Sequence, residues 1–170
     1  MKYEEIDITC PNCGELAKFE EPFEFISNDS VASNETRPCH QWGAWIVVER
    51  FPSQVKWKSP RGSSQYLRSG RESEDGGYPL YTNGFINCSS CHANKKHKLT
   101  WPDDAFWQWE IKSELLWAWN RQHAQVIFEY IKKTTRPPRY NYYLRYIPSH
   151  FLSSNLRERV VKKMEMALNN

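Results

Sequence analysis

Four of the five cysteines form two pairs with the same spacing, Cys10-x-x-Cys13 and Cys88-x-x-Cys91. A tight Cys-x-x-Cys turn brings two sulfur atoms to one side of the backbone, so that both thiolates can bind one cation. Two such turns that face each other supply the four ligands of a tetrahedral zinc site. Because a closed shell of four cysteines leaves no position for water or substrate, we expect one structural Zn²⁺ at Cys10, Cys13, Cys88 and Cys91.

Other chemistry is compatible with one of these pairs taken alone. Cys88 to His92 reads CSSCH, which is the spacing of a c-type haem attachment site, and a redox dithiol also uses a single pair. Haem attachment calls for an exported chain, and no helix is predicted directly after Cys13 or Cys91, as a redox motif would require. Zinc is therefore preferred, with an iron–sulfur centre or another metal, a redox site and haem as the alternatives.

Cys39 and His40 are left over from this pattern. We interpret Cys39 as a free thiol in a loop; the alternative is that Cys39 or His40 joins His92 or His97 in a second metal site. His92 is expected to face solvent or to form a hydrogen bond to a ligand rather than to bind the metal itself. The roles of Cys39, His40 and His92 stay open at this point.

The N-terminus and the hydropathy favour a cytoplasmic protein. MKYEEIDITC carries acidic residues where a signal peptide has basic residues followed by an apolar run. No stretch of about 18 uncharged apolar residues exists, so no membrane span is expected. Five cysteines in a reducing compartment are better explained by metal binding than by disulfides.

Alternation of apolar and polar residues predicts an antiparallel β structure in the first two thirds of the chain. Pro22 is expected to interrupt the second strand, because proline cannot donate to a sheet. Residues 54–59, QVKWKS, are predicted to form a hairpin with the strand at 42–51, and residues 27–41 and 60–78 are predicted to be loops. The predicted strands are residues 3–9, 16–25, 42–51, 80–87, 97–101 and 105–111.

The apolar period changes to a helical one after residue 113. Residues 114–134 place apolar side chains and His123 on one stripe, which predicts a helix that ends before Pro137. A second helix is predicted at 156–168, with Asn155 and Glu158 as a capping box. Its apolar side is expected to be Leu156, Val160, Met164 and Leu168.

The segments CPNCG at 10–14 and CSSC at 88–91, followed by predicted strands, resemble the zinc-ribbon class of small zinc domains. The resemblance implies an α+β fold in which a zinc-ribbon-like antiparallel sheet carries a long insertion between the two knuckles and precedes a C-terminal helical part. The predicted organisation is a β domain at 1–112 with an insertion at 26–79, and a helical region at 113–170 packed on it. Zinc ribbons serve many tasks, so the fold alone implies no specific function.

The uneven charge distribution is compatible with an anionic partner, and a solvated basic surface is the commoner alternative. Residues 1–94 carry 9 basic and 13 acidic residues, whereas residues 95–170 carry 14 basic and 7 acidic residues. Lysines and arginines next to aromatic rings are typical of nucleic-acid surfaces, because cations neutralise phosphates and rings stack on bases. We therefore predict a zinc-binding module that binds nucleic acid or associates with a nucleoprotein complex. The predicted phosphate contacts are Lys95, Lys96, Lys98, Arg136, Arg139 and Arg145.

The alternative function is a protein-interaction adaptor or regulatory subunit that docks a partner through an aromatic surface. Trp117 is the candidate for that surface, because the helical pattern places it opposite the main apolar stripe. His123 lies on the apolar stripe, which favours a structural histidine. No catalytic triad, paired carboxylates or small-molecule substrate site can be identified, so an enzymatic function is not predicted.

Overall fold

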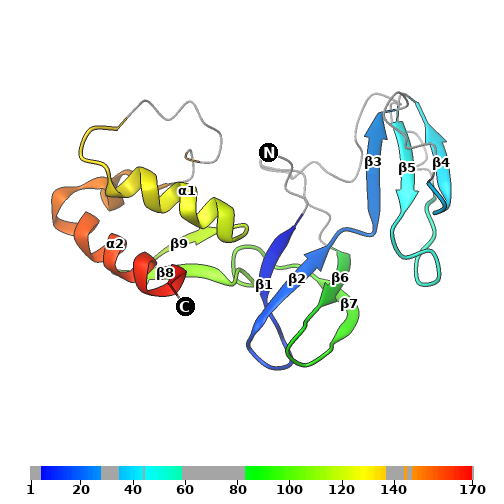
Figure 1. Cartoon of the computed structure of the whole chain (residues 1–170), viewed down its shortest axis with the longest axis horizontal. Coiled ribbons are helices and arrows are strands. Elements are labelled where there is room, and N and C mark those ends of the chain that lie inside the picture. The colour runs from blue at the N-terminus through cyan, green and yellow to red at the C-terminus, as the bar shows by residue number, and fades with distance from the viewer. Residues whose placement is uncertain are drawn as a thin grey trace. The chain divides into compact units, whose positions relative to one another are not determined.

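The computed structural model describes residues 5–27, 35–43, 45–58, 83–136, 144 and 147–169 (Figure 1). Within these residues the chain forms nine β-strands, two α-helices and one short 3-10 helix. The chain divides into two compact units. The first unit comprises Met1–Phe19, Asn87–Ala93 and Thr100–Asn170, and the second comprises Glu20–Ile86 and Asn94–Leu99.

The first unit begins with two antiparallel strands. β1 (Ile6–Thr9) pairs with β2 (Leu16–Glu20), with Ile6 opposite Phe19 and Thr9 opposite Leu16. β2 alternates between half-buried and buried residues, as expected for a strand with one face on a core. The turn that joins β1 and β2 contains the first cysteine pair.

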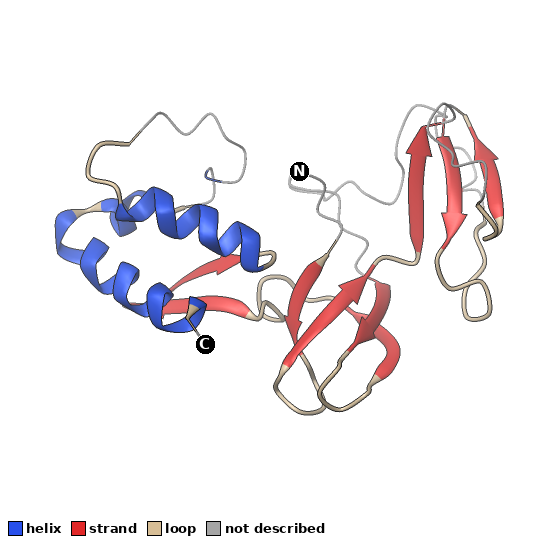
Figure 2. Ribbon diagram, viewed as in Figure 1, coloured by secondary structure: helices blue, strands red, loops and turns tan. Residues whose placement is uncertain are grey.

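A two-stranded sheet and helices make up the C-terminal part of the first unit (Figure 2). β8 (Trp107–Ile111) and β9 (Glu114–Ala118) are antiparallel neighbours. They contact the helices α1 (Arg121–Lys132) and α2 (Ser154–Leu168), which also pack on each other, and η3 (Ser149–Leu152) precedes α2. No helix among the described residues is long and apolar enough to span a membrane.

One apolar core fills the space between these helices and strands. β8 buries Trp107, Trp109 and Ile111 and exposes the residues between them, which confirms the period-two reading of this segment. The helices contribute the 3.6-period faces expected of amphipathic helices. The buried helical residues of this core are Ala124, Ile127, Phe128, Tyr130, Ile131, Leu156, Val160, Met164 and Leu168.

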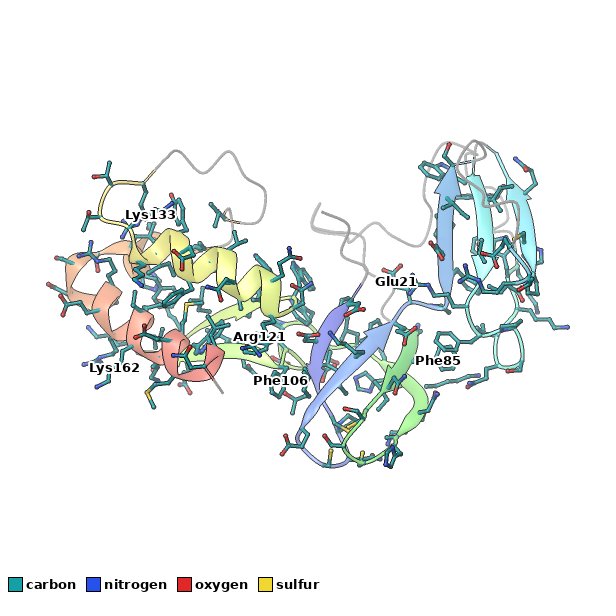
Figure 3. All side chains as sticks on the ribbon, in the orientation of Figure 1. Glu21, Phe85, Phe106, Arg121, Lys133 and Lys162 are labelled. Carbon is teal, nitrogen blue, oxygen red and sulfur yellow. The ribbon has the colours of Figure 1, made fainter. Side chains whose placement is uncertain are left out.

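Asp7 joins β1 to this helical part of the first unit. Its backbone N–H donates to the Trp119 carbonyl at 2.7 Å, and its carbonyl accepts from the N–H of Phe106 at 3.1 Å. Its carboxylate accepts from the indole nitrogen of Trp107 at 2.6 Å and from the backbone N–H of Arg121 at 3.1 Å. Figure 3 shows Phe106 and Arg121 near β1. A single buried residue of β1 therefore contacts two segments that lie roughly one hundred residues later in the chain.

The second unit contains a three-stranded antiparallel sheet of β3 (Phe23–Ser27), β5 (Trp45–Glu49) and β4 (Cys39–Trp42), in that order. Phe23 lies opposite Glu49, and Cys39 lies opposite Val48. The small core of this sheet is aromatic. It consists of Phe23, Phe25, Trp42 and Val47, with Trp45, Val55 and Trp57 packed against it.

β6 (Asn83–Asn87) and β7 (Asn94–Lys98) are neighbouring strands that flank the second cysteine pair. The N–H of Cys88 donates to the Ala93 carbonyl at 3.0 Å and closes the turn between them. β6 buries its three central residues, whereas β7 contains four exposed residues and the half-buried His97. The knuckles at 10–13 and 88–91 are thus parts of hairpin-like turns, separated by a long insertion.

The mixed antiparallel fold with two helices agrees with the sequence, but the predicted helix at 114–134 is wrong in its first part. Residues 114–118 form β9, which turns back on β8 through Lys112 and Ser113. The helix starts only after Asn120, whose side chain caps it by accepting from the N–H of His123. The domain boundary predicted between residues 112 and 113 stays a prediction. The strands on either side of it, β8 and β9, form one hairpin.

Four smaller predictions are also corrected. Residues 55–58 form no strand, and the partners of β5 are β3 and β4. β4 begins inside the loop predicted at 27–41, and the strand predicted at 97–101 is instead β7 at 94–98. α2 has Ser153 rather than Asn155 as its N-cap, although its four predicted apolar residues are all buried. The loop predicted at 60–78 lies outside the described residues.

Candidate metal centre

The two cysteine pairs lie in turns that share one backbone pattern. In each turn the N–H of the first cysteine donates to the carbonyl five residues later: Cys10 to Glu15 at 2.7 Å and Cys88 to Ala93 at 3.0 Å. The fourth residue after the first cysteine has a positive φ in both turns, +79° at Gly14 and 57° at His92. The two knuckles are therefore equivalent, and His92 occupies the position that glycine occupies in the first knuckle.

The four sulfur atoms form one cluster, in which all lie within 4.8 Å of one another. Sγ of Cys10 lies 3.7 Å from Sγ of Cys91, and Sγ of Cys13 lies 3.6 Å from Sγ of Cys88. A tetrahedral Zn(Cys)₄ site has sulfur–sulfur distances of about 3.8 Å, because its Zn–S bonds are about 2.3 Å long. The sulfur–sulfur bond of a disulfide is about 2.05 Å long. The observed distances therefore fit four thiolates around a cation and do not fit disulfide bonds.

Both of these sulfur–sulfur contacts join one knuckle to the other. All four cysteines belong to the first unit, and one residue of each pair is buried while the other is exposed. Cys10 and Cys88 are each only 1% exposed, and Cys13 and Cys91 lie toward solvent. An ion between them would be shielded on one side and within reach of solvent on the other.

Backbone amides and neighbouring sulfurs set the acidity of the thiols. The backbone N–H of Asn12 donates a hydrogen bond to the sulfur of Cys10. Together with hydrogen bonds from the N–H of Cys13 and from the thiols of Cys88 and Cys91, it outweighs the effect of burial. The pKa of Cys10 is thereby lowered to about 6. For Cys13, the N–H of Glu15 lowers the pKa, but burial and the other three sulfurs outweigh it and raise the pKa to about 12. The thiolate of Cys10 thus forms readily, whereas the pKa values of Cys13 and Cys91 are raised, because like charges accumulate in the cluster. A bound cation would remove this repulsion.

Asn12 and Glu15 donate to sulfur through their backbone N–H groups, which every residue except proline has. Their part in the centre therefore could not be predicted from the sequence. His92 is exposed, and the described residues contain no second cluster of metal-ligating side chains. Cys39 is exposed and donates to the Arg37 carbonyl at 3.3 Å. Nε2 of His40 lies 2.8 Å from the Glu49 carboxylate.

The residues predicted to contact phosphates lie in different environments. Lys95, Lys96 and Lys98 are exposed on β7. Arg136 donates to the carbonyls of Tyr130, Ile131 and Leu152 at 3.1 to 3.3 Å. The guanidinium of Arg136 therefore holds the C-terminal end of α1. Arg139 and Arg145 lie outside the described residues.

The candidate aromatic surface is a cluster of tryptophans. Trp117 is half-buried and contacts Trp101 and Trp119 edge to face, with ring centroids 5.3 and 4.9 Å apart. Trp101 and Trp119 stack on each other at 4.1 Å. His123 is buried, and its Nδ1 accepts from the N–H of Trp119, which agrees with the structural role expected for it.

Three findings define the centre: the matching turns, the sulfur distances and the shared location in the first unit. They are consistent with a zinc-knuckle-like site, which is as far as the resemblance to zinc ribbons extends. Comparison of the chain with protein-family models, with curated proteins and with solved structures finds no match.

Proposed function

We propose that this chain is a structural zinc-binding module in which Cys10, Cys13, Cys88 and Cys91 hold one Zn²⁺. The observation that supports the proposal is the cluster of four sulfur atoms within 4.8 Å. Thiolates are preferred ligands of zinc, and four of them fill its tetrahedral shell. The ion then has no open position for water, so its role is to stabilise the fold and not to catalyse a reaction.

The site joins two chain segments that are far apart in sequence. Cys13 and Cys88 are 75 residues apart, and their sulfur atoms are only 3.6 Å apart. Closing a loop of this length costs conformational entropy. Structural zinc supplies apparent binding free energies on the order of 10–16 kcal/mol in small zinc domains, which is more than sufficient to offset that cost. The zinc would thus keep the two knuckles of the first unit together.

The turns themselves favour a metal of fixed geometry. Both are closed by a backbone hydrogen bond from the first cysteine, which limits how far the thiolates can move. A closed four-thiolate shell of this kind can also hold iron, whose thiolate complexes absorb visible light, whereas Zn²⁺ is colourless because its d shell is full. Metal identity is therefore decided by measurement on the purified protein.

Elemental analysis combined with chelation tests the proposal. The purified full-length protein is expected to contain about one zinc per chain and to be colourless. Removal of zinc with a strong chelator should lower the melting temperature, and added Zn²⁺ should restore it. Folded protein with four reduced cysteines and no zinc would contradict the proposal, as would stoichiometric iron.

A further inference from the structure

The second unit contains a cavity of about 450 Å³ that is not part of the metal centre. This volume lies within the range of about 300–1,000 Å³ that is usual for small-molecule sites. The apolar part of its wall includes Phe23, Val55 and Phe85. The polar and charged residues of the lining are Asn83, Lys96, His97 and Lys98.

Neighbouring aromatic rings hold the apolar wall in place. The ring of Phe85 packs on the ring of Phe51 with centroids 4.2 Å apart. The ring of Phe23 packs edge to face on Trp57 with centroids 5.2 Å apart. Figure 3 marks Phe85 on β6. Because both lining phenylalanines are buried and packed, the wall is preformed and a ligand would not have to order it.

The charged part of the lining is cationic. Lys96 and Lys98 are two residues apart on β7, so their side chains leave the same face of the strand. Both are exposed, and within the described part of the chain neither takes part in an ion pair or a side-chain hydrogen bond. None of the described lining residues is acidic. The cavity therefore suits a ligand with an apolar body and an attached negative charge.

Further cations flank the cavity along the chain. Lys95 precedes Lys96 on β7, and Lys56 and Lys58 follow Val55; all three are exposed. The acidic residues next to Pro22 and Phe23 are Glu21 and Glu24, which are half-buried, and Glu24 pairs with Arg37 and Arg50. A ligand with a single charged group would need only Lys96 and Lys98. A ligand with a charge at each repeat would use the flanking lysines as well. This distribution favours a polyanion with apolar groups, which is the chemistry of single-stranded nucleic acid.

We propose that this cavity binds one base of a single-stranded nucleic acid, with the adjoining phosphates at Lys96 and Lys98. The base would contact the apolar wall of Phe23, Val55 and Phe85, and the Asn83 amide can donate to or accept from a base edge. The binding is independent of base sequence, because one amide and an apolar wall recognise any planar base. The proposal does not depend on the metal centre.

Fluorescence anisotropy with a short fluorescein-labelled oligothymidylate tests the proposal on the full-length protein at ~50 mM salt, where phosphate contacts are strongest. The first variant carries Lys96→Gln and Lys98→Gln. The matched control carries Lys133→Gln and Lys162→Gln, two exposed lysines of the first unit that Figure 3 labels. Both variants lose two positive charges. A difference between them therefore reports a local contact at the cavity and not the change in net charge. An abasic oligomer of equal length measures the contribution of the base.

The expected result is binding that weakens in the Lys96/Lys98 variant and not in the Lys133/Lys162 variant. In a plot of the logarithm of the binding constant against the logarithm of salt concentration, the slope of the first variant should be less steep by roughly 1.4. Each of the two lost phosphate contacts to a single strand contributes about 0.7. The abasic oligomer should bind more weakly than oligothymidylate. Zinc content and circular dichroism, measured on the same samples, should be unchanged.

Four outcomes would overturn the proposal. These are no binding of oligothymidylate at ~50 mM salt, equal losses in the two variants, equal binding of the abasic oligomer, and binding of free thymidylate as tightly as the oligomer. The last result would indicate a mononucleotide site instead. Equal binding of the abasic oligomer would indicate a general polyanion surface.

Discussion

The carboxylate of Asp7 accepts a hydrogen bond of 2.6 Å from the indole nitrogen of Trp107, one hundred residues later in the chain. The same oxygen accepts from the N–H of Arg121 at 3.1 Å, and the other oxygen accepts from Nζ of Lys18 at 2.7 Å. Asp7 is only 1% exposed. A buried carboxylate is stable when its charge is paired and its oxygens are hydrogen-bonded, and both conditions are met here.

Replacement of Asp7 by alanine is predicted to destabilise the first unit by about 3 kcal/mol. The change leaves the buried indole N–H of Trp107 and the part-buried backbone N–H of Arg121 without this acceptor. It also removes one of the two carboxylates paired with Lys18, the other being that of Glu5. The measurement is urea unfolding followed by tryptophan fluorescence. Asp103→Ala is the matched control, because Asp103 is exposed and its removal should change the free energy of unfolding by less than about 0.5 kcal/mol. Equal effects of the two changes would contradict the assigned role of Asp7.

Glu49 gives the second unit a predicted dependence on pH. Its side chain is 2% exposed, and it accepts from the N–H of Trp57 at 2.6 Å and lies 2.8 Å from Nε2 of His40. The Trp57 amide, and then His40, outweigh burial and hold the pKa of Glu49 below its ordinary value of 4.5. A carboxyl group whose pKa is lower in the folded than in the unfolded state stabilises the fold at pH values above its unfolded pKa. This stabilisation is lost as the pH falls through the pKa of the folded state.

Glu49→Gln should therefore remove part of the acid sensitivity of the protein. Wild-type protein is expected to lose stability as the pH falls below about 4.5, and the variant should lose less over the same interval. Unfolding is measured at several pH values for the two proteins, which share the same metal centre, so that metal loss cancels in the comparison. Glu129→Gln, at an exposed position of α1, should follow the wild-type profile.

The equivalent positions Gly14 and His92 predict opposite effects of substitution. Both have a positive φ, which glycine adopts without strain and other residues adopt at a cost of about 1–2 kcal/mol. Nothing lies within 4 Å of a Cβ built on Gly14, so Gly14→Ala should cost only this backbone strain. His92→Gly should leave the protein as stable or more stable, and zinc content should not change. A loss of zinc from His92→Gly would show that His92 contributes to the metal centre.

The parts of the fold that the sequence predicted are those in which burial follows a clear period. β8 alternates strictly, and α2 repeats Leu156, Val160, Met164 and Leu168, so pattern and packing agree. β9 was predicted as helix because Leu115 and Leu116 are adjacent and merge with the apolar stripe of α1. The turn before β9 has positive φ at Lys112 and Ser113, whereas glycine and asparagine are the residue types that signal this backbone conformation.

The bounds of β7 were predicted wrongly, and the cavity was missed, for a related reason. β7 contains no apolar residue, so its strand conformation comes from pairing with β6 and not from its own pattern. The cysteine cluster, in contrast, could be predicted because thiolate chemistry and Cys-x-x-Cys spacing constrain it locally. The lining of the cavity has no such local rule, since it combines residues from segments that meet only in the folded chain.

Arg136 is predicted to affect stability through α1. Its guanidinium donates to three carbonyls, those of Tyr130 and Ile131 in the last turn of α1 and that of Leu152 in η3. Arg136→Ala should lower the free energy of unfolding by about 1–2 kcal/mol, because these carbonyls lose their donor. Arg136→Lys should recover only part of the lost stability, because the ammonium group of lysine lacks the planar fork with which the guanidinium reaches three carbonyls. Arg159→Ala, on the exposed side of α2, should be nearly neutral.

The cysteines provide the last prediction, in which Cys88→Ser is compared with Cys39→Ser. Cys88 is buried, and its sulfur lies 3.6 Å from that of Cys13, whereas Cys39 is exposed and is not one of the four clustered cysteines. Cys88→Ser replaces a thiolate by a hydroxyl that remains protonated, so it should lower zinc content well below one per chain and lower the melting temperature. Cys39→Ser should retain zinc and stability, which makes it the control for the loss of a thiol as such. If both variants keep zinc and fold alike, the thiolate of Cys88 is not needed for the fold. If both lose zinc, the ligand set must include Cys39, and the cluster of four would not describe the site.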